Sequence, residues 1–549
     1  MYSSLTESLR NKNFAMHNSL FYPSKNPHWT STRWKKAESI IAKLQHRIAK
    51  ATLEGDFRKV RNLQRLLVKS LSARLKAVRQ VAQENKEKNT SGIDGQLWET
   101  PTRKLNAAFL LHKRCKTKPL RRIYICNKDG SSRSLGLPVM FDRAHQALWN
   151  LALIPVVETT SDSFSYGFRP YRGCWDAHAQ IQAILSRKDS DTWILDANIR
   201  KCCDTSSHDW LLKNTPMERK ILKCWLKSGF MNPSTSVSDF ENQGEFFNTE
   251  KGFSQAGVIS PTLANPSPLG QHSVHSVVTS YFTNHVFNGM QNVFENTFPS
   301  PLGQHFVPCK QVDSSSPKTC YSSQSPSVSD FATKVNLIRY ADDFIITGQS
   351  HAQLEKVQSV LTGFLQPRGL ELNPGKTRIV HISQGFDFLG WSFRKASNGY
   401  LLRVISKKDE QCHKAKLRDI VKNSRNKPPS ALISELNLVI RRWCQYHRCC
   451  CRVWPVSSRT NQYLFRLLWK WARNRHTRRS RLWIYDKYWK YVDGRRTFGS
   501  SNGKDFNDYK LIPYRFKNLP IRDLKGTTNV YLAFSATKNM FVKSGFRNR

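Results

Sequence analysis

Two adjacent carboxylates, Asp342 and Asp343, stand between apolar arms in the segment 337–346. Branched residues dominate both arms, which predicts two buried strands joined by a turn. An unpaired carboxylate is costly to bury, so core packing does not explain two of them. At one edge of a sheet they could hold divalent metal ions, as nucleotidyl transfer requires. The two acids alone leave open a solvated Asp-Asp turn between ordinary strands.

The chain is strongly basic: its 549 residues carry a formal net charge of +47. This length allows several domains with a large core, and the charge predicts a polyanionic partner. The 15 Trp and 17 Tyr often neighbour Arg or Lys, which suits stacking on unpaired bases and favours RNA over DNA. No apolar run approaches the roughly 18 residues of a spanning helix, so no membrane partner is predicted.

The 13 cysteines form neither a CxxC pair nor a regular framework. This pattern argues against a disulfide scaffold or a zinc site and indicates a reduced compartment. His272 and His305, with two nearby cysteines, could suggest a metal site. Their Ser-, Pro- and Asn-rich surroundings instead favour flexible surface loops over 266–281 and 300–332.

The elements that must position the acids can be predicted from periodicity. Apolar residues at helical spacing predict two or three amphipathic helices between Trp34 and about Lys88, with basic outer faces. Residues 119–138 predict a strand, a turn and a second strand, and residues 193–199 predict a further strand.

Eight motifs follow one another between residues 92 and 394: GIDG, RRIYI with KDG and LGLP, SYGFRP, DAN, SQAGVISPTLAN, RYADD, GLELNPGKT and FDFLGW. Their order resembles the reverse transcriptase of group II intron-encoded proteins. The region beyond residue 400 resembles that family's thumb and maturase domain. The resemblance implies an α+β right-hand polymerase fold, with fingers and an antiparallel palm sheet followed by an α-helical thumb and maturase bundle.

The resemblance also implies roles for the acids, because the family's palm carboxylates hold two magnesium ions. By matching residues, Asp342 is the principal metal ligand and Asp343 its weaker neighbour, and Mg2+ is the cofactor if polymerase activity survives. The family's other palm acid falls at Asn198. An amide offers one neutral oxygen where an anion should bridge two dications, so we expect an impaired polymerase. Asp196 could substitute only with a backbone shift or a bulge, because it lies two residues back along the strand.

Other departures from the family pattern point the same way. Lys201 stands where the family usually has Gly, and Cys203 stands where it has an aromatic residue that shapes the nucleotide pocket. Gly375 occupies a position usually held by Glu. Together these changes indicate relaxed demands on polymerisation.

The matching motifs also assign binding residues. For nucleotide and template we expect Arg122, Arg133, Arg169, Gln255 and Lys376. For RNA we expect basic and aromatic residues of the maturase region: Arg441, Arg442, Trp443, Tyr446, Trp469, Trp471, Arg473 and Arg475.

We expect seven segments along the chain. They are a polar N-terminal segment (1–33), a helical extension (34–90), the first part of the fingers and palm (91–265), an insertion with short repeats (266–333), the second part of the palm (334–400), the thumb and maturase domain (401–500), and a basic tail that is a remnant of a DNA-binding region (501–549).

The leading hypothesis is a group II intron maturase, an RNA-binding protein that assists splicing of its host intron while the RNA performs the chemistry. The alternative is an active RNA-directed DNA polymerase that supports intron mobility, and a third reading is a decayed frame without a retained role. No endonuclease is expected, because no cysteine follows Cys451. Intron RNA is the expected partner, with a DNA target and a homodimer as further options. We expect an organelle, chloroplast ahead of mitochondrion, with a bacterial cytoplasm as the alternative.

Overall fold

The structure is a computed structural model. It describes residues 28–85, 87–112, 116–126, 132–167, 169, 172–187, 189–231, 246–252, 286–298, 335–492, 494–500, 509–514 and 516. Several expectations lie outside these residues: the loops at 266–281 and 300–332, Gln255 and most of the basic tail. No helix in the described part of the chain combines the length and the apolarity needed to cross a bilayer.

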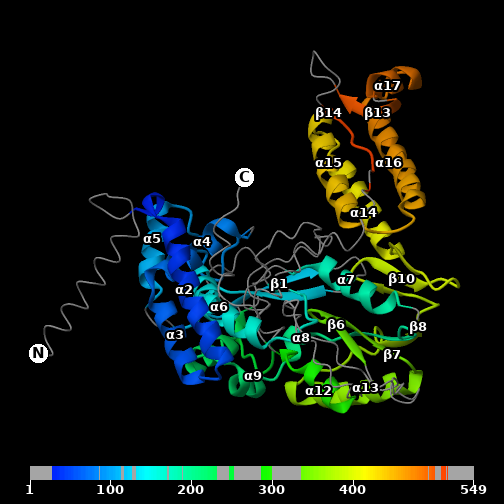
Figure 1. The fold of residues 1–549 in the computed structure, drawn as a ribbon. Helices are drawn as coiled ribbons and strands as arrows, with labels where there is room; N and C mark the ends of the chain where they lie inside the picture. The colour runs from blue at the N-terminus through cyan, green and yellow to red at the C-terminus, as the bar shows by residue number, and fades with distance from the viewer. Residues whose placement is uncertain are drawn as a thin grey trace, which may run out of the picture.

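The amino-terminal helices form a layer on one side of the molecule (Figure 1). They are η1 (Trp29–Ser31), α2 (Trp34–Leu53), α3 (Phe57–Lys69), α4 (Leu71–Arg79), the π-helical η2 (Gln80–Glu84), α5 (Pro101–Leu110) and α6 (Met140–Thr160). Their apolar stripes face one another and bury Ile48, Leu67 and Leu75. The helices predicted between Trp34 and Lys88 are therefore confirmed.

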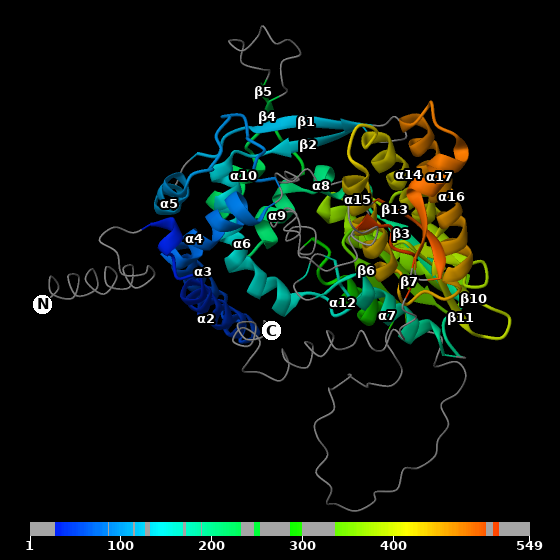
Figure 2. The same cartoon turned by 90° about the horizontal axis from the view of Figure 1, so that it is seen from above.

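The predicted basic hairpin is also confirmed, as β1 (Leu120–Cys126) and β2 (Ser132–Leu137), which pair antiparallel. The sheet continues through β4 (Phe230–Met231) and β5 (Phe246–Phe247), in the order β2-β1-β4-β5. Figure 2 shows this sheet between the amino-terminal helices and the carboxyl-terminal half.

The central sheet holds the predicted acids. Its four antiparallel strands follow the order β6-β7-β3-β8: β6 (Asn336–Tyr340), β7 (Asp343–Gly348), β3 (Trp193–Asn198) and β8 (Arg378–His381). Because side chains alternate along a strand, Ile194 packs on one face with α7 (Cys174–Leu185), and Leu195 packs on the other with α13 (His351–Leu365). The sheet is therefore buried on both faces, and Asn198 and Asp343 lie where β3 ends and β7 begins.

Short helices complete this half of the chain: α8 (Cys202–Thr205), α9 (His208–Asn214), α10 (Arg219–Leu226), α12 (Met290–Thr297) and η4 (Gln366–Arg368). A three-stranded sheet follows, made of β9 (Phe386–Phe388), β10 (Trp391–Lys395) and β11 (Leu401–Ile405). Since β10 and β11 are hydrogen-bonded neighbours, the boundary expected at 400/401 cuts this sheet. We propose a boundary after Ile405 instead.

The last described part is a helical bundle that stands away from the central sheet (Figure 1). It contains α14 (Lys407–Asn423), α15 (Pro429–Tyr446), α16 (Val453–Arg475) and α17 (Arg481–Tyr488), with a sheet of β12 (Trp489–Val492), β13 (Arg495–Ser500) and β14 (Tyr509–Lys510). We call it the C-terminal bundle. The helical periodicity predicted its helices, but the short strands lacked a comparable signal.

Candidate functional site

The paired acids lie where β6 turns into β7, as predicted. Tyr340 and Asp343 face each other across the hairpin, and Ala341 between them has a left-handed φ of 59°. Gly167 lies directly against this turn, because a Cβ at this position would collide with the backbone nitrogen of Ala341. The SYGF motif therefore needs glycine here so that the two backbones can approach each other.

A fully buried arginine, Arg339, stabilises the same turn through a hydrogen bond. The Arg339 guanidinium donates a hydrogen bond from Nη1 to the carbonyl oxygen of Ala341, at 3.3 Å. Its Cζ also lies 5.1 Å from the centre of the Phe287 ring. Burial lowers the pKa of Arg339 to about 10, and the carboxyl of Asp162 opposes that shift. The side chain remains cationic at neutral pH and fixes the backbone that carries the acids.

Asn198 meets Asp343 directly, because the two residues are paired in register across β3 and β7. The Asn198 side-chain nitrogen donates a hydrogen bond to Oδ1 of Asp343. Asp343 is exposed at the surface, although the neighbouring protein partly desolvates its carboxyl. This desolvation raises the pKa of Asp343 to about 6, with the charge of Asp342 as the second cause, while the Asn198 amide opposes the rise.

Asp196, the expected substitute, is bonded elsewhere. Its Oδ2 accepts a hydrogen bond from Nε of Arg378, at 3.2 Å, and the two residues are cross-strand partners. Burial raises the pKa of Asp196, and Arg378 opposes this shift. The register between β3 and β7 runs without a break from Trp193 to Asn198. The backbone therefore has no bulge that would advance Asp196 into the position of Asn198.

These residues do not fit a two-metal centre. The amide of Asn198 directs an N–H at a carboxylate, whereas a divalent ion needs oxygen ligands with enough negative charge. Among the described residues, no group of three or more His, Cys, Asp or Glu is placed to hold a metal ion. The edge keeps the backbone geometry of the predicted site without its full set of ligands.

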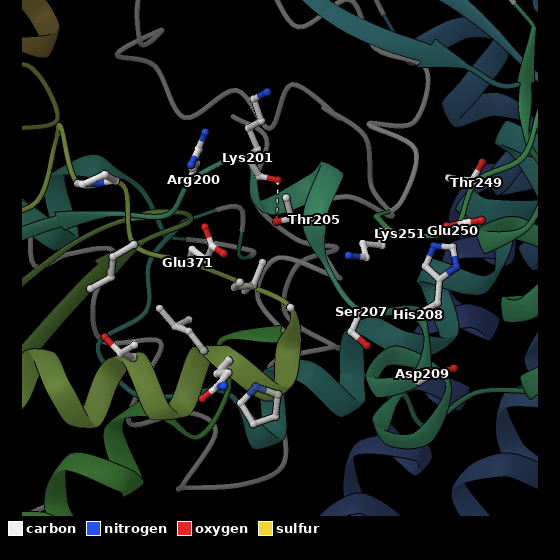
Figure 3. A pocket seen from close by; sticks show the side chains of 18 of the residues that line it. Arg200, Lys201, Thr205, Ser207, His208, Asp209, Thr249, Glu250, Lys251 and Glu371 are labelled. Carbon is white, nitrogen blue, oxygen red and sulfur yellow. Dashed lines mark hydrogen bonds between the residues drawn. The ribbon is translucent and has the colours of Figure 1, made fainter.

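A separate cavity of about 1520 Å³ opens beside the central sheet. Figure 3 shows Arg200, Lys201, Lys251 and Glu371 among its charged lining residues. Lys201 has a left-handed φ of 45° and begins α8. The described residues that line this cavity do not include Asp342 or Asp343. We place the candidate site at the acids, because the mixed charges of the cavity define no particular chemistry.

The residues expected to bind nucleotide and template have different environments. Arg122 is half-buried, with its Cζ 3.8 Å from the centre of the Phe230 ring. Arg169 is buried and forms a bidentate pair with Glu158, at 3.0 and 3.1 Å, so its guanidinium is occupied within the protein. Lys376 is exposed, and its charge acts on Asp343. The side chain of Arg133 and all of Gln255 lie outside the described residues.

Three of the aromatic residues expected to contact RNA are core residues instead. Trp443, Tyr446 and Trp471 are 4%, 2% and 5% exposed. The Tyr446 hydroxyl donates to the Leu389 carbonyl at 2.6 Å, and the Trp471 indole donates to the Ser424 carbonyl at 3.0 Å. The helical period identified an apolar face here, but aromatic residues among arginines did not reveal which side the partner helices cover.

The other residues expected to contact RNA remain accessible. Trp469 and Arg442 are half-buried, whereas Arg441, Arg473 and Arg475 are exposed. They lie along α15 and α16, where their charges can reach a polyanion.

The sequence did not indicate the buried contacts at the end of the C-terminal bundle that lies against α7 and β10, which we call the joint. Oδ2 of Asp409 accepts hydrogen bonds from Nε1 of Trp443 and Nε2 of His447, both at 2.8 Å. Trp175 of α7 donates to the Tyr446 carbonyl at 3.0 Å and ties the bundle to the central sheet. No local motif announces such contacts, because their partners are far apart in the chain.

Three family models match successive parts of the chain. The N-terminal domain of reverse transcriptase matches residues 29–111, and reverse transcriptase (RNA-dependent DNA polymerase) matches 125–267 and 309–393. The group II intron, maturase-specific domain matches residues 410–489, within the C-terminal bundle.

Relatives of known name match large parts of the chain. Protein YkfC of Escherichia coli (strain K12) is 26% identical over 383 residues, which cover 67% of this chain and 92% of that protein. Group II intron-encoded protein LtrA of Lactococcus lactis subsp. cremoris is 26% identical over 310 residues, 52% of this chain and 48% of LtrA. Maturase-like protein 1 of Euglena gracilis is 24% identical over 423 residues, 76% of each chain. The match to LtrA thus spans about half of that relative.

The order of these models along the chain repeats the order of the motifs, and the mixed fold with antiparallel sheets agrees with them. The chain therefore belongs to the family of group II intron-encoded reverse transcriptases and maturases.

Proposed function

We propose that this protein is a group II intron maturase. It binds its host intron, stabilises the fold in which the RNA splices, and leaves the transesterification to the RNA. The match to a maturase-specific domain and the net charge of +47 support this role.

The observation that carries the proposal is the pairing of the palm acids with protein groups. Asn198 bonds Asp343, and Arg378 bonds Asp196. Reverse transcriptases generally use Mg2+, and these residues would hold it poorly. The site therefore argues against efficient polymerisation, and the RNA-binding role rests on the maturase-specific domain and the net charge.

The proposed mechanism is electrostatic and geometric. A folded intron brings phosphates close together, and their repulsion opposes compaction. Exposed cations such as Arg441, Arg473 and Arg475 neutralise those phosphates and release counterions. Binding should therefore weaken strongly between about 50 and 200 mM salt.

The experiment compares splicing in cells with and without the protein. Loss of the protein should reduce splicing of the host intron, and re-expression of Asp342→Ala should restore it. A variant with Arg441, Arg473 and Arg475 all changed to Glu should not restore it. Unchanged splicing in the absence of the protein would overturn the proposal.

The intact turn around Asp342 favours one alternative, an RNA-directed DNA polymerase that supports intron mobility. Extension of a primer on an RNA template with Mg2+, abolished by Asp342→Ala, would establish that activity.

Finer aspects of the role are part of the same proposal. We propose an organelle as the compartment, chloroplast ahead of mitochondrion, and a DNA target and a homodimer as secondary interactions. Fractionation of the cells and sedimentation of the purified protein test the compartment and the dimer.

A further inference from the structure

α17 and β13 lie at the end of the C-terminal bundle farthest from the central sheet (Figure 1). Aromatic rings of α17 and β12 form a stacked ladder there. The ring geometry comes from the side-chain contacts of α17 and β12: the Tyr485 and Trp489 rings are stacked, with centroids 5.6 Å apart and planes 10° apart. The Arg496 guanidinium continues the ladder, because its Cζ lies 5.0 Å from the centre of the Tyr485 ring. Trp489 is buried and anchors the ladder in the core.

A second tyrosine, the cross-strand partner of Arg496, is open to solvent. Tyr491 is 73% exposed and pairs in register with Arg496 across β12 and β13. Cross-strand partners present their side chains on the same face of a sheet. A planar ligand could therefore contact the phenol of Tyr491 and the guanidinium of Arg496 together. We call Tyr485, Trp489, Tyr491 and Arg496 the stacking platform.

The charge around the stacking platform favours a polyanion. Residues 473–496 contain two Asp, and nine cationic residues: Arg473, Arg475, Arg478, Arg479, Arg481, Lys487, Lys490, Arg495 and Arg496. All nine cationic side chains are exposed. Phosphates passing this surface would meet cations on both sides of the open ring of Tyr491.

We propose that the stacking platform binds an unpaired nucleotide of RNA, with the base stacked against Tyr491 and Arg496. This inference rests on the proposed function and names the class of RNA that this end of the bundle takes. Bases inside an A-form helix are stacked on one another, so a paired RNA offers phosphates and 2′-hydroxyls but no free base face. Only a single strand, loop or bulge would use the rings as well as the cations.

The experiment measures binding of the full chain to two labelled RNAs with the same number of phosphates, one unpaired and one fully paired. Tyr491→Ala should weaken binding of the unpaired RNA about tenfold, as expected for one lost base–aromatic stack. It should change binding of the paired RNA by less than about twofold. Equal losses for both RNAs would overturn the inference.

Tyr400 provides a matched control. Its side chain is 72% exposed, a fraction close to the 73% of Tyr491. It lies in the link between β10 and β11, outside the stacking platform. Tyr400→Ala should leave both affinities unchanged. A loss as large as that of Tyr491→Ala would show that any exposed tyrosine has this effect, and would overturn the inference.

Arg496 separates stacking from charge. Arg496→Lys keeps the charge but loses the planar guanidinium. It should therefore weaken the binding of unpaired RNA and leave the salt dependence of that binding unchanged. Arg496→Ala should also reduce the slope of log affinity against log salt by about 1. If Arg496→Lys binds unpaired RNA like the wild type, the guanidinium does not stack on a base.

Failure of the inference can be distinguished from failure of the proposed function. If the wild type binds both RNAs and supports splicing, while Tyr491→Ala behaves like the wild type, only the stacking platform is refuted. If the wild type binds neither RNA, the maturase proposal fails with it.

Discussion

Asp343 and Asp409 both accept hydrogen bonds from uncharged side chains, but their pKa values shift in opposite directions. Asp343, at the edge of the central sheet, faces the Asn198 amide and a second carboxylate, and its pKa is raised to about 6 by burial and by Asp342. Burial would also raise the pKa of Asp409 in the joint, but hydrogen bonds from His447 and Trp443 outweigh it and lower the pKa.

The difference shows what each region is arranged to hold. Two well-aligned donors satisfy Asp409 without any added cation. In the described part of the chain the Asn198 amide bonds Asp343, and the negative charge of Asp342 outweighs the opposing charge of Lys376. The joint is thus complete as built, whereas the sheet edge retains part of a site made for a cation.

The largest expected effect is the loss of Asp409. Asp409→Ala leaves the buried Trp443 and His447 donors unpaired and should lower the free energy of unfolding by about 3 kcal/mol. Urea denaturation followed by tryptophan fluorescence measures it. Asp343→Ala is the control and should cost less than about 0.5 kcal/mol. Equal decreases in the free energy of unfolding for the two variants would contradict the proposed difference between the regions.

The next largest effect concerns pH: acidification should change the stability contributed by the buried histidines and by Asp343 in opposite directions. Burial lowers the pKa of His178 and His413 to about 3 from the ordinary 6.5. Below about pH 6.5 these histidines become protonated in the unfolded chain but stay neutral in the folded protein, so the free energy of unfolding decreases. At pH 5 each histidine accounts for a decrease of about 2 kcal/mol. Asp343 acts oppositely, since its folded pKa of about 6 exceeds the ordinary 3.8 and its protonation adds stability as pH falls between them.

Variants make that pH dependence specific. His413→Gln should flatten the loss of stability between pH 7 and 5, and Asp343→Asn should steepen it. Thermal unfolding across this range measures both. A flatter profile for Asp343→Asn would contradict the raised pKa of Asp343.

A smaller effect is expected from restoring the missing acid. Asn198→Asp places a third carboxylate beside Asp343 and should cost about 1 kcal/mol without divalent ions, through like-charge repulsion. Mg2+ should recover this loss, whereas the wild type should respond to Mg2+ no more than to a monovalent salt of equal ionic strength. Thermal unfolding with and without Mg2+ measures it, and a Mg2+-specific stabilisation of the wild type would refute the incomplete site.

The smallest effect concerns Arg378, whose side chain is 55% exposed. Arg378→Gln releases Asp196 and should change stability by less than about 0.5 kcal/mol, as for other exposed ion pairs. Because Asp196 still lies two residues back from Asn198, this variant should not acquire a Mg2+ response. A Mg2+-dependent rise in melting temperature would show that Asp196 can substitute.

Local patterns in the sequence predicted the elements whose signals are local. The hairpin at 337–346, the strand ending at Asn198 and the amino-terminal helices were all expected from periodicity and turn chemistry, and the structure contains them. The matching motifs assigned Asn198 to the position of the other palm acid, and the register of the central sheet pairs this residue with Asp343.

The environments of individual side chains could not be predicted in the same way. Trp443 lies in the core, whereas Tyr491 is exposed, although both stand among basic residues. The difference depends on which helices pack together, which the spacing of residues within one helix does not specify. The Arg378–Asp196 pair likewise joins residues 182 positions apart.

The contacts of Trp175 and Tyr446 have a consequence for the length of the bound RNA. The Trp175 indole donates to the Tyr446 carbonyl, and the Tyr446 hydroxyl donates to the Leu389 carbonyl. These bonds join α15 of the C-terminal bundle to α7 and to the link between β9 and β10, through a shared core. These contacts hold one end of the bundle against the body of the protein, so the fold sets the distance from the sheet edge to the bundle's far end. An intron with two contact regions separated by that distance would bind the protein at both places. An intron with a shorter separation would bind at only one of them.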